Sequence, residues 1–216
     1  MENEYRDASG KRLIDYPRPS VAVDTAVLTV PPSGPLSVVQ VRDAEAGDWR
    51  LPGTFVHEGE RLAAAVLRSL SEKAGVAGLA PTQLHVFDEP SRDSRGWVLS
   101  VAHLDVVPFA ALAPGLDRAG AQLVPVDDAT GMVHGHDDIL AFAVARLRTT
   151  YAGAPDPHGL LAEPFTMSEL RAVHEAVLGE RLLPDSFRRA MVPMLVDTGE
   201  RAASGPGKPA ARYRRA

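Results

Sequence analysis

The sequence predicts an α+β protein built from two domains, and two observations indicate this. Strand-like and helix-like segments alternate between residues 21 and 151, a pattern typical of an α/β or α+β domain in which helices cover a sheet. After residue 151 the order changes to helix, tight turn, helix and hairpin, the layout of a winged helix-turn-helix. We therefore expect a flexible arm over residues 1–20, a first domain over 21–151 and a winged domain over 152–216.

The composition is that of an ordinary globular protein, with 45% apolar and 24% charged residues among 216. Cys is absent, which excludes disulfides, cysteine-ligated metals and a thiol nucleophile. The apolar runs are shorter than the roughly 18–20 residues of a membrane helix. The polar first 20 residues lack the apolar core of a signal peptide. We expect a soluble, cytoplasmic protein with no membrane partner.

The charge is distributed unevenly along the chain. The net charge is −5, yet residues 181–216 hold 8 Lys and Arg against 3 Asp and Glu. A basic end on an acidic body is typical of a nucleic-acid-binding appendage, and a solvated tail without a partner explains it equally well.

The first domain opens with two β-branched, apolar segments, residues 21–30 and 36–42, which predict strands joined by a Pro/Gly/Ser turn. Residues 61–74 have a helical period, because Leu62, Val66, Leu70 and Ala74 recur every four positions and form one apolar face. Gly75 is well placed to end this helix.

Residues 83–87 and 97–107 predict two further strands, whereas residues 108–136 give no clear pattern. Residues 137–151 predict a helix with two Asp at its start and Arg146 and Arg148 near its end, as the helix dipole favours. The Pro- and Gly-rich residues 152–159 are typical of a linker.

In the second domain, Thr166 and Glu169 fit a capping box at the start of a helix that Gly179 ends. Residues 184–191 predict a second helix, which Pro193 should end or kink. Residues 195–197 and 210–214 then predict two short strands around a basic tip.

Residues 51–76 resemble the Nudix box, which reads Gly, five residues, Glu, seven residues, then Arg-Glu-apolar-x-Glu-Glu-x-Gly-apolar. The matching positions are Glu60, Arg68, Leu70, Glu72, Gly75 and Val76. Thr54 replaces the opening Gly, Ser69 the first helical Glu and Lys73 the last Glu. The resemblance implies a Nudix fold, an α/β/α sandwich with a mixed sheet.

These replacements fall on the residues that carry the box's chemistry. Nudix hydrolases cleave diphosphates with Mg²⁺ or Mn²⁺, hard cations that need a cluster of carboxylates. Positions 69, 72 and 73 should converge on one helix face, where this chain supplies a hydroxyl, one carboxylate and an ammonium. The Lys73 charge would repel a cation there. We expect no metal, no other cofactor, no catalytic residue and no metal-dependent hydrolysis, with the cleft retained.

A degenerate Nudix box followed by a winged helix is similar to the Nudix-related transcriptional regulators of bacterial NAD metabolism. The resemblance extends over most of residues 16–216, including Pro90–Trp97, His136–Leu140 and the Phe187-Arg188-Arg189 motif. It implies a homodimeric repressor of NAD biosynthesis or salvage genes. Its Nudix-like domain would sense ADP-ribose or a related nucleotide, and its winged helices would bind double-stranded DNA at a palindromic operator.

The candidate DNA-binding residues lie on the two helices and the hairpin of the winged domain. Guanidinium groups on the second helix could reach guanine edges or phosphates, and those of the hairpin would grip phosphate. For Thr166, helix capping alone is an alternative. The candidates are Thr166, Ser168, Ser186, Arg188, Arg189, Lys208, Arg212 and Arg214.

The candidate effector-binding residues are charged side chains in and beside the box, together with two arginines at 92 and 95 that the family resemblance implies, and the arginines could clamp a pyrophosphate bidentately. They are Arg50, Glu60, Arg68, Glu72, Arg92 and Arg95. Arg68 and Glu72 are also spaced as an i, i+4 ion pair, an equally good interpretation. The run of residues 134–138, with two His and two Asp, suggests metal ligands at first sight, although turn and capping roles explain it better.

Two rival functions remain open. A Nudix hydrolase with an altered box would act on ADP-ribose or a related diphosphate, and Glu60 and Glu72 are consistent with it. A scaffold whose winged helix binds protein would show little salt dependence, whereas DNA binding weakens steeply with salt.

Overall fold

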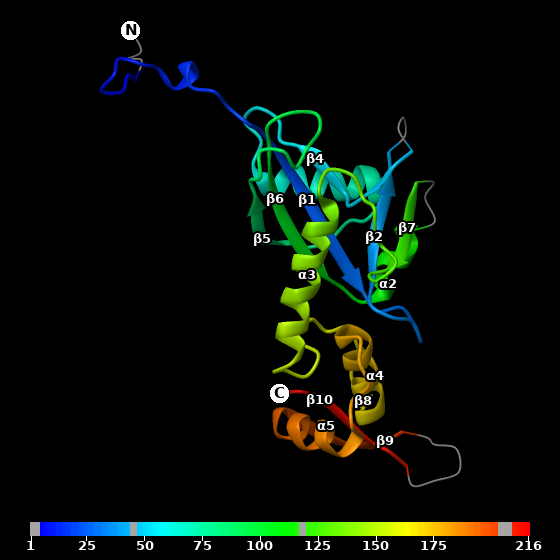
Figure 1. The fold of residues 1–216 in the computed structure, drawn as a ribbon. Coiled ribbons are helices and arrows are strands. Elements are labelled where there is room, and N and C mark those ends of the chain that lie inside the picture. The colour runs from blue at the N-terminus through cyan, green and yellow to red at the C-terminus, as the bar shows by residue number, and fades with distance from the viewer. Residues whose placement is uncertain (1–4, 44–46, 117–119, 203–208) are drawn as a thin grey trace.

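The computed structural model describes residues 5–43, 47–116, 120–202 and 209–216. It forms two stacked domains joined by one long helix (Figure 1). The first domain contains η1 (Leu13–Asp15), β1 (Ser20–Thr29), β2 (Ser37–Arg42), β3 (Trp49–Arg50), β4 (Gly53–Phe55), α1 (Leu62–Ser69), the π-helical turn η2 (Leu70–Ala74), β5 (Thr82–Phe87), β6 (Val98–Val106), α2 (Phe109–Leu116), β7 (Ala121–Pro125) and α3 (His136–Tyr151).

A mixed sheet forms the centre of this domain. Its main path runs β3-β2-β1-β6-β5, with β4 also paired to β1 and β7 to β2. The pair β1–β6 is parallel, whereas the other pairs are antiparallel. The expected α/β/α sandwich with a mixed sheet is thereby confirmed.

Alternation along β1 divides the core into two layers, because successive side chains of a strand point to opposite faces. Val23 and Val27 pack with Val66 and Leu70 of the α1–η2 segment. Ala26 and Leu28 instead pack with residues of α3, including Ile139 and Leu147. The periodic face predicted for residues 61–74 is the buried one, and Gly75 ends the segment at φ 66°.

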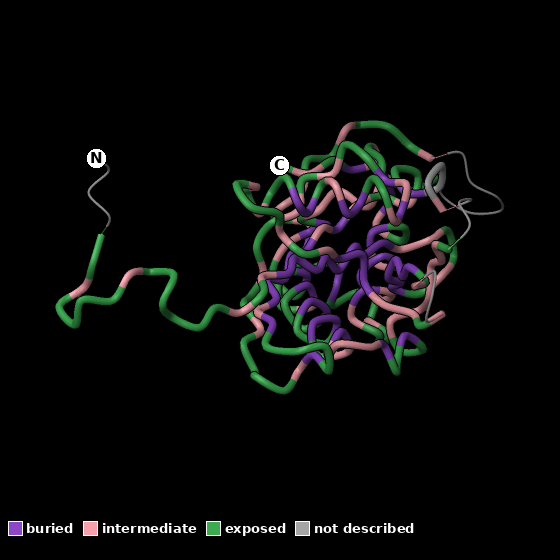
Figure 2. The backbone as a smooth tube through the Cα atoms, turned by 90° about the horizontal axis from the view of Figure 1, so that it is seen from above, coloured by how far each residue is buried: buried purple, intermediate pink, exposed green. Residues whose placement is uncertain are grey.

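The predicted strands and helices of the first domain are confirmed within a few residues. The unassigned stretch 108–136 contains α2 and β7, and the short strands β3 and β4 were not predicted. Residues 5–19 of the arm extend away from the domain (Figures 1 and 2) and include only η1.

The winged domain contains β8 (Phe165–Thr166), α4 (Met167–Leu178), α5 (Pro184–Met191), η3 (Val192–Met194), β9 (Leu195–Arg201) and β10 (Ala211–Arg215). Its sheet order is β8-β10-β9. The capping box at Thr166 begins α4 and the left-handed Gly179 ends it, as predicted. Pro193 lies in η3, directly after α5, as expected from its missing N–H.

The linker is more ordered than its composition indicates. Residues 152–159 do connect the domains, yet Asp156 within them has an exposed fraction of 0%. In the part of the chain that is described, no helix combines the length and apolar character needed to cross a membrane.

Candidate functional site

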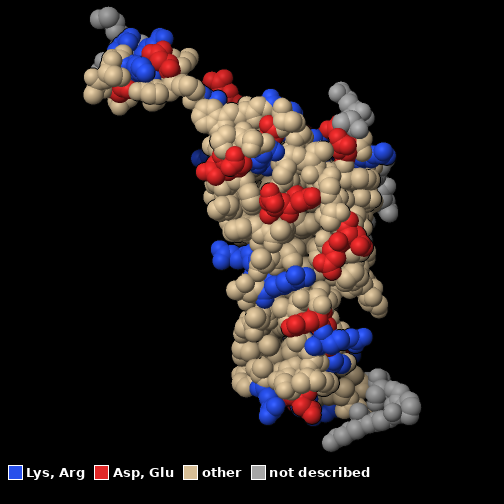
Figure 3. All heavy atoms as spheres, viewed as in Figure 1, with Lys and Arg blue, Asp and Glu red and all other residues tan. Residues whose placement is uncertain are grey.

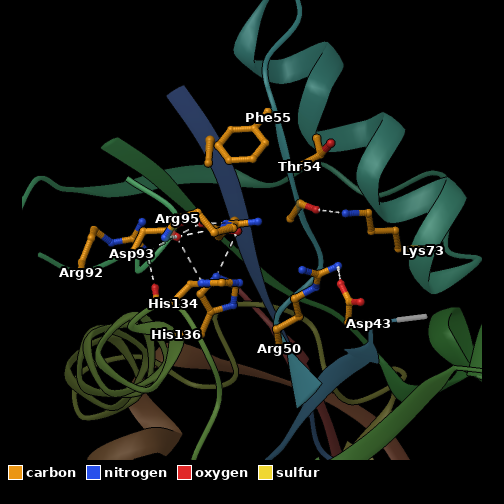
Figure 4. A pocket seen from close by; sticks show the side chains of 13 residues that line it. Asp43, Arg50, Thr54, Phe55, Lys73, Arg92, Asp93, Arg95, His134 and His136 are labelled. Atoms are coloured by element: carbon orange, nitrogen blue, oxygen red, sulfur yellow. Dashed lines mark hydrogen bonds and ion pairs between the residues drawn. The ribbon is translucent and has the colours of Figure 1, made fainter. Parts of the chain in front are cut away.

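A hollow of about 190 Å³ opens beside the start of β1 in the first domain. Two of its walls come from β4 and the η2 helical turn, and two from the loops at residues 92–95 and 134–136 (Figure 4). Its lining is Ala22, Asp24, Asp43, Arg50, Gly53, Thr54, Phe55, Lys73, Arg92, Asp93, Arg95, His134 and His136.

Four cationic side chains from distant parts of the sequence converge here. Arg50 pairs with Asp43 at 2.6 Å. Arg95 pairs with Asp93 through two nitrogens at 2.9 and 2.7 Å. The other two cations are Arg92 and Lys73, which donate to the backbone carbonyls of His134 and Gly53 (Figure 4). Each cation is therefore held by an oxygen of the protein.

A buried carboxylate forms the floor of the hollow. Asp24 is 5% exposed and accepts a hydrogen bond from Ser100 Oγ at 2.5 Å. The Nδ1 atom of His136 accepts from the Leu51 amide at 2.9 Å, so the ring proton sits on Nε2, 3.3 Å from Asp24. Burial raises the pKa of Asp24, but the contacts with His136 and Ser100 outweigh it and lower the pKa overall. Asp24 is therefore a fixed negative charge.

The second acidic group of the wall is Asp93, which is 4% exposed. Hydrogen bonds from Arg95 lower the pKa of Asp93 to about 2, so it stays ionised at neutral pH. His134 Nδ1 lies 3.3 Å from the same carboxylate, while burial lowers the pKa of His134. This wall presents Arg95 to the hollow in a fixed orientation.

The structure brings together only half of the six predicted effector-binding residues. Arg50, Arg92 and Arg95 line the hollow, whereas Glu60, Arg68 and Glu72 lie outside its lining. The Arg68 guanidinium contacts both Glu60 oxygens at 2.9 Å, and this pairing lowers the pKa of Glu60 to about 2. The predicted partner, Glu72, is 4.0 Å away and its side chain is 62% exposed. The main partner of Arg68 is thus Glu60.

The box helix does not carry a cation-binding face. Positions 69, 72 and 73 were expected to converge, and this expectation is wrong, because Ser69 is buried, Glu72 is exposed and Lys73 alone faces the hollow. Ser69 is buried and its Oγ lacks a partner among the described residues. Only Lys73 of the three lines the hollow. The residues here do not fit the Mg²⁺ of Nudix hydrolases, and the described ranges contain no group of three His, Asp or Glu suited to a metal.

Sequence reasoning missed several lining residues, among them Asp24, Asp43 and Asp93. The His-rich run had offered a signal, since His134 and His136 both line the hollow. The turn role predicted for this run applies to Asp137, which accepts from the Gly131 and Met132 amides at 2.8 and 3.0 Å. The N-cap position is Gly135, which makes no side-chain cap.

A second candidate surface lies on the winged domain, where Figure 3 shows Lys and Arg side chains at several places. Ser186, Arg188 and Arg189 are exposed on α5, while Phe187 and Met191 turn into the domain core. Arg188 donates to the Tyr213 hydroxyl at 3.2 Å, which ties α5 to β10. The helix therefore presents its basic face outward.

The other predicted DNA-binding residues differ in accessibility. Ser168 and Arg214 are exposed, and Arg212 is half-buried with a hydrogen bond to the Pro164 carbonyl at 3.0 Å. Thr166 is 8% exposed and its hydroxyl bonds to Glu169, as the capping alternative predicted. Lys208 lies outside the described residues.

Two family models match the chain, the NUDIX domain at residues 21–142 and the NrtR DNA-binding winged helix domain at residues 157–215. The chain is 29% identical over 209 residues to the ADPR responsive transcriptional repressor NtrR of Acinetobacter baylyi, covering 93% of this chain and 83% of the relative.

Solved structures also show similarity to NrtR. NrtR of Shewanella oneidensis in complex with a 27mer DNA is 31% identical with a TM-score of 0.75, covering 91% of this chain and 93% of that one. The NUDIX domain of the same protein in complex with ADP ribose is 26% identical with a TM-score of 0.57, covering 68% and 99%.

Proposed function

The chain belongs to the Nudix-related transcriptional regulators, which join a NUDIX domain to an NrtR-type winged helix domain, and we propose that it is a DNA-binding repressor that senses ADP-ribose. The observation that carries the proposal is the convergence of four cations on a hollow without a metal-binding carboxylate cluster among the described residues. Such a site suits an anionic ligand that is bound and left intact. The relatives that respond to ADPR and bind ADP ribose support this ligand class.

In this proposal the pyrophosphate of the effector replaces the carboxylates that hold the arginines. Arg95 already holds a carboxylate through two nitrogens, the bidentate geometry that phosphate oxygens also offer, and Arg50 pairs with a second carboxylate through Nη2. Lys73 adds a point charge from the opposite wall. Because Lys73 stands where the box has a Glu, we propose that the chain lacks metal-dependent hydrolysis.

The winged domain would contact DNA through α5 and the β9–β10 hairpin. Arg188 and Arg189 on α5 would enter the major groove, and Arg214 on β10 would contact phosphate. We further propose a homodimer that recognises a palindromic operator with half-sites one or more helical turns apart, roughly 10–10.5 bp centre to centre. The cytoplasm would be its site of action, and genes of NAD biosynthesis or salvage its targets.

A gel-shift titration tests the proposal, using DNA from upstream of this chain's own gene and its neighbours, with and without ADP-ribose. We expect a retarded complex whose midpoint shifts with ADP-ribose, and much weaker binding by Arg188→Ala/Arg189→Ala. Binding by that double variant equal to the parent's would refute the role of α5. Release of phosphate products from ADP-ribose with Mg²⁺, abolished by Glu72→Gln, would favour the hydrolase instead.

A further inference from the structure

A buried acidic group lies at the point where the two domains meet. Asp156 is 0% exposed, and its two carboxylate oxygens accept four hydrogen bonds. The donors are the Tyr151 hydroxyl at 2.8 Å, the Leu160 and Leu161 amides at 2.9 Å each, and Arg215 Nη1 at 2.6 Å. Asp156 also has a φ of 45°, which is uncommon for a non-glycine residue and persists only where the surroundings fix it.

These contacts connect three separate parts of the fold. Tyr151 is the last residue of α3, Arg215 is the last residue of β10, and Leu160 and Leu161 belong to the segment between α3 and β8. Arg215 is further held by Glu163 at 2.8 Å and by the Leu161 carbonyl at 3.2 Å. Removing one partner of such a buried pair leaves the other charge uncompensated, so the arrangement opposes any shift of β10 relative to α3.

A chain of rings extends from the same place to α5. Tyr151 contacts His174 of α4 edge-on at 5.0 Å between ring centroids, and His174 contacts Phe187 of α5 in the same way at 5.0 Å. Burial lowers the pKa of His174 to about 4, so its Nε2 is free to accept the Asp156 amide at 3.2 Å. The helix with the exposed arginines is therefore connected to the end of α3 through His174 of α4.

The opposite end of α3 is part of the effector hollow. His136, the first residue of α3, contacts the floor residue Asp24, and His134 precedes it in the wall. The 16 residues of α3 span about 24 Å at 1.5 Å per residue. One continuous helix, α3, thus runs from the first domain towards the winged domain (Figure 1), and its last residue, Tyr151, bonds to Asp156.

Beside this contact a cavity of about 440 Å³ lies between the two domains. It lies between the β1–β2 turn, the start of α2 and one side of α4. Its walls are mostly apolar, and Leu160 and Leu161 are part of them. Elsewhere α4 docks on α3, because Val173 and Val177 share an apolar cluster with Leu147 and Tyr151, and Arg148 donates to the Val177 carbonyl at 3.1 Å. The orientation of the winged domain therefore depends on contacts with the last turns of α3, those of Asp156 among them.

We propose that Asp156 is the positioning residue that fixes the winged domain on α3, and that coupling between the effector hollow and the DNA-binding surface passes through it. This inference rests on the proposed function, because it assumes both an effector and an operator. Asp156 itself would touch neither ligand. Through Asp156, a movement of the first turn of α3 would be passed on to α5 and β10.

The test measures the ratio of the DNA dissociation constants with and without ADP-ribose, together with the ADP-ribose dissociation constant from calorimetry. The variant is Asp156→Asn. The matched control is Glu175→Gln, which changes a half-buried carboxylate of the same domain. Glu175 binds Arg171 at 2.8 Å and the Leu182 amide at 2.9 Å, and neither of these partners belongs to α3. Tyr151→Phe is a milder second variant that removes one donor to Asp156.

We expect coupling factors in the usual 5- to 150-fold range for the parent and Glu175→Gln. Asp156→Asn should bring the ratio of DNA dissociation constants to within about twofold of 1 and leave the ADP-ribose affinity unchanged. Tyr151→Phe should lower the ratio at least about threefold, because it removes one hydrogen bond to Asp156. A parental ratio in either folded variant overturns the inference. A parent that binds no DNA or ignores ADP-ribose refutes the proposed function itself, and should Asp156→Asn not fold, the Tyr151→Phe ratio decides.

Discussion

The substitution Gly53→Ala should disrupt the packing around Asp24 at the floor of the effector hollow and destabilise the fold. A Cβ at this position would lie 1.8 Å from Asp24 Oδ1, 2.9 Å from its Cγ and 2.9 Å from the Val23 carbonyl oxygen. Asp24 cannot simply rotate away, because Ser100 and His136 hold its oxygens. The Val23 carbonyl belongs to β1 and is equally fixed. The methyl group must therefore displace either the buried, hydrogen-bonded Asp24 carboxylate or a central strand.

The expected cost follows from these two conflicts. Overpacking costs about 1–3 kcal/mol, and weakening a buried hydrogen bond to a charged group costs about 1.5–3 kcal/mol. With partial relaxation, the loss should total about 2–4 kcal/mol. At about 2–4 °C per kcal/mol for a chain of this size, the melting temperature should fall by about 5–15 °C, and calorimetry should show much weaker ADP-ribose binding.

Gly153→Ala is the matched control, because Gly153 has open space around its Cβ position and no positive φ. It should change the stability by no more than about 0.5 kcal/mol. Equal melting temperatures for Gly53→Ala and the parent would refute the close approach of Gly53 to Asp24. A large loss in Gly153→Ala as well would show that the effect is not specific to the hollow.

Three further outcomes are expected. Asp43→Asn removes the carboxylate that competes for Arg50, and because a partly exposed pair contributes up to about 1 kcal/mol, calorimetry should show ADP-ribose binding up to about fivefold tighter. The pKa of His174 is about 4 in the folded protein and 6.5 in the unfolded chain, so the unfolded chain takes up the proton first as the pH falls. Urea titrations should therefore show the free energy of unfolding decreasing by up to about 3 kcal/mol between about pH 6.5 and about pH 4. The His174→Gln variant should not show this decrease. The slope of log K for operator binding against log salt should be shallower by roughly 2 in Arg188→Ala/Arg189→Ala than in the parent, and an identical slope would exclude phosphate contacts by these residues.

The parts of the fold that depend on local sequence could be predicted. The four-residue spacing of Val66, Leu70 and Ala74 identified the buried helix face, and Thr166 with Glu169 identified a helix start. Residues 108–136 could not be assigned, because α2 includes a Pro and a Gly that local preference places outside helices. Here packing against β7 and the sheet overrides the intrinsic preference.

The candidate site was harder to predict because its contacts join distant residues. His136 bonds to an amide 85 positions away, and Ser100 to a carboxylate 76 positions away. Asp156, in a segment with the composition of a linker, pairs with an arginine 59 positions later. Periodicity and motif spacing report on neighbours within one element, so Arg92 and Arg95 were predicted from the family resemblance, while Asp24, Asp43 and Asp93 stayed unassigned.

Those acidic partners explain how a binding hollow can also be a switch. A ligand changes an equilibrium only through different interactions with its two states. Here a pyrophosphate that takes Arg95 from Asp93 would leave that carboxylate with His134, two residues before α3 begins. The site with its ion pairs intact and the site with a ligand thus place different charges beside the first turn of α3. The carboxylates that neutralise the arginines are therefore the groups through which ligand binding would reach α3.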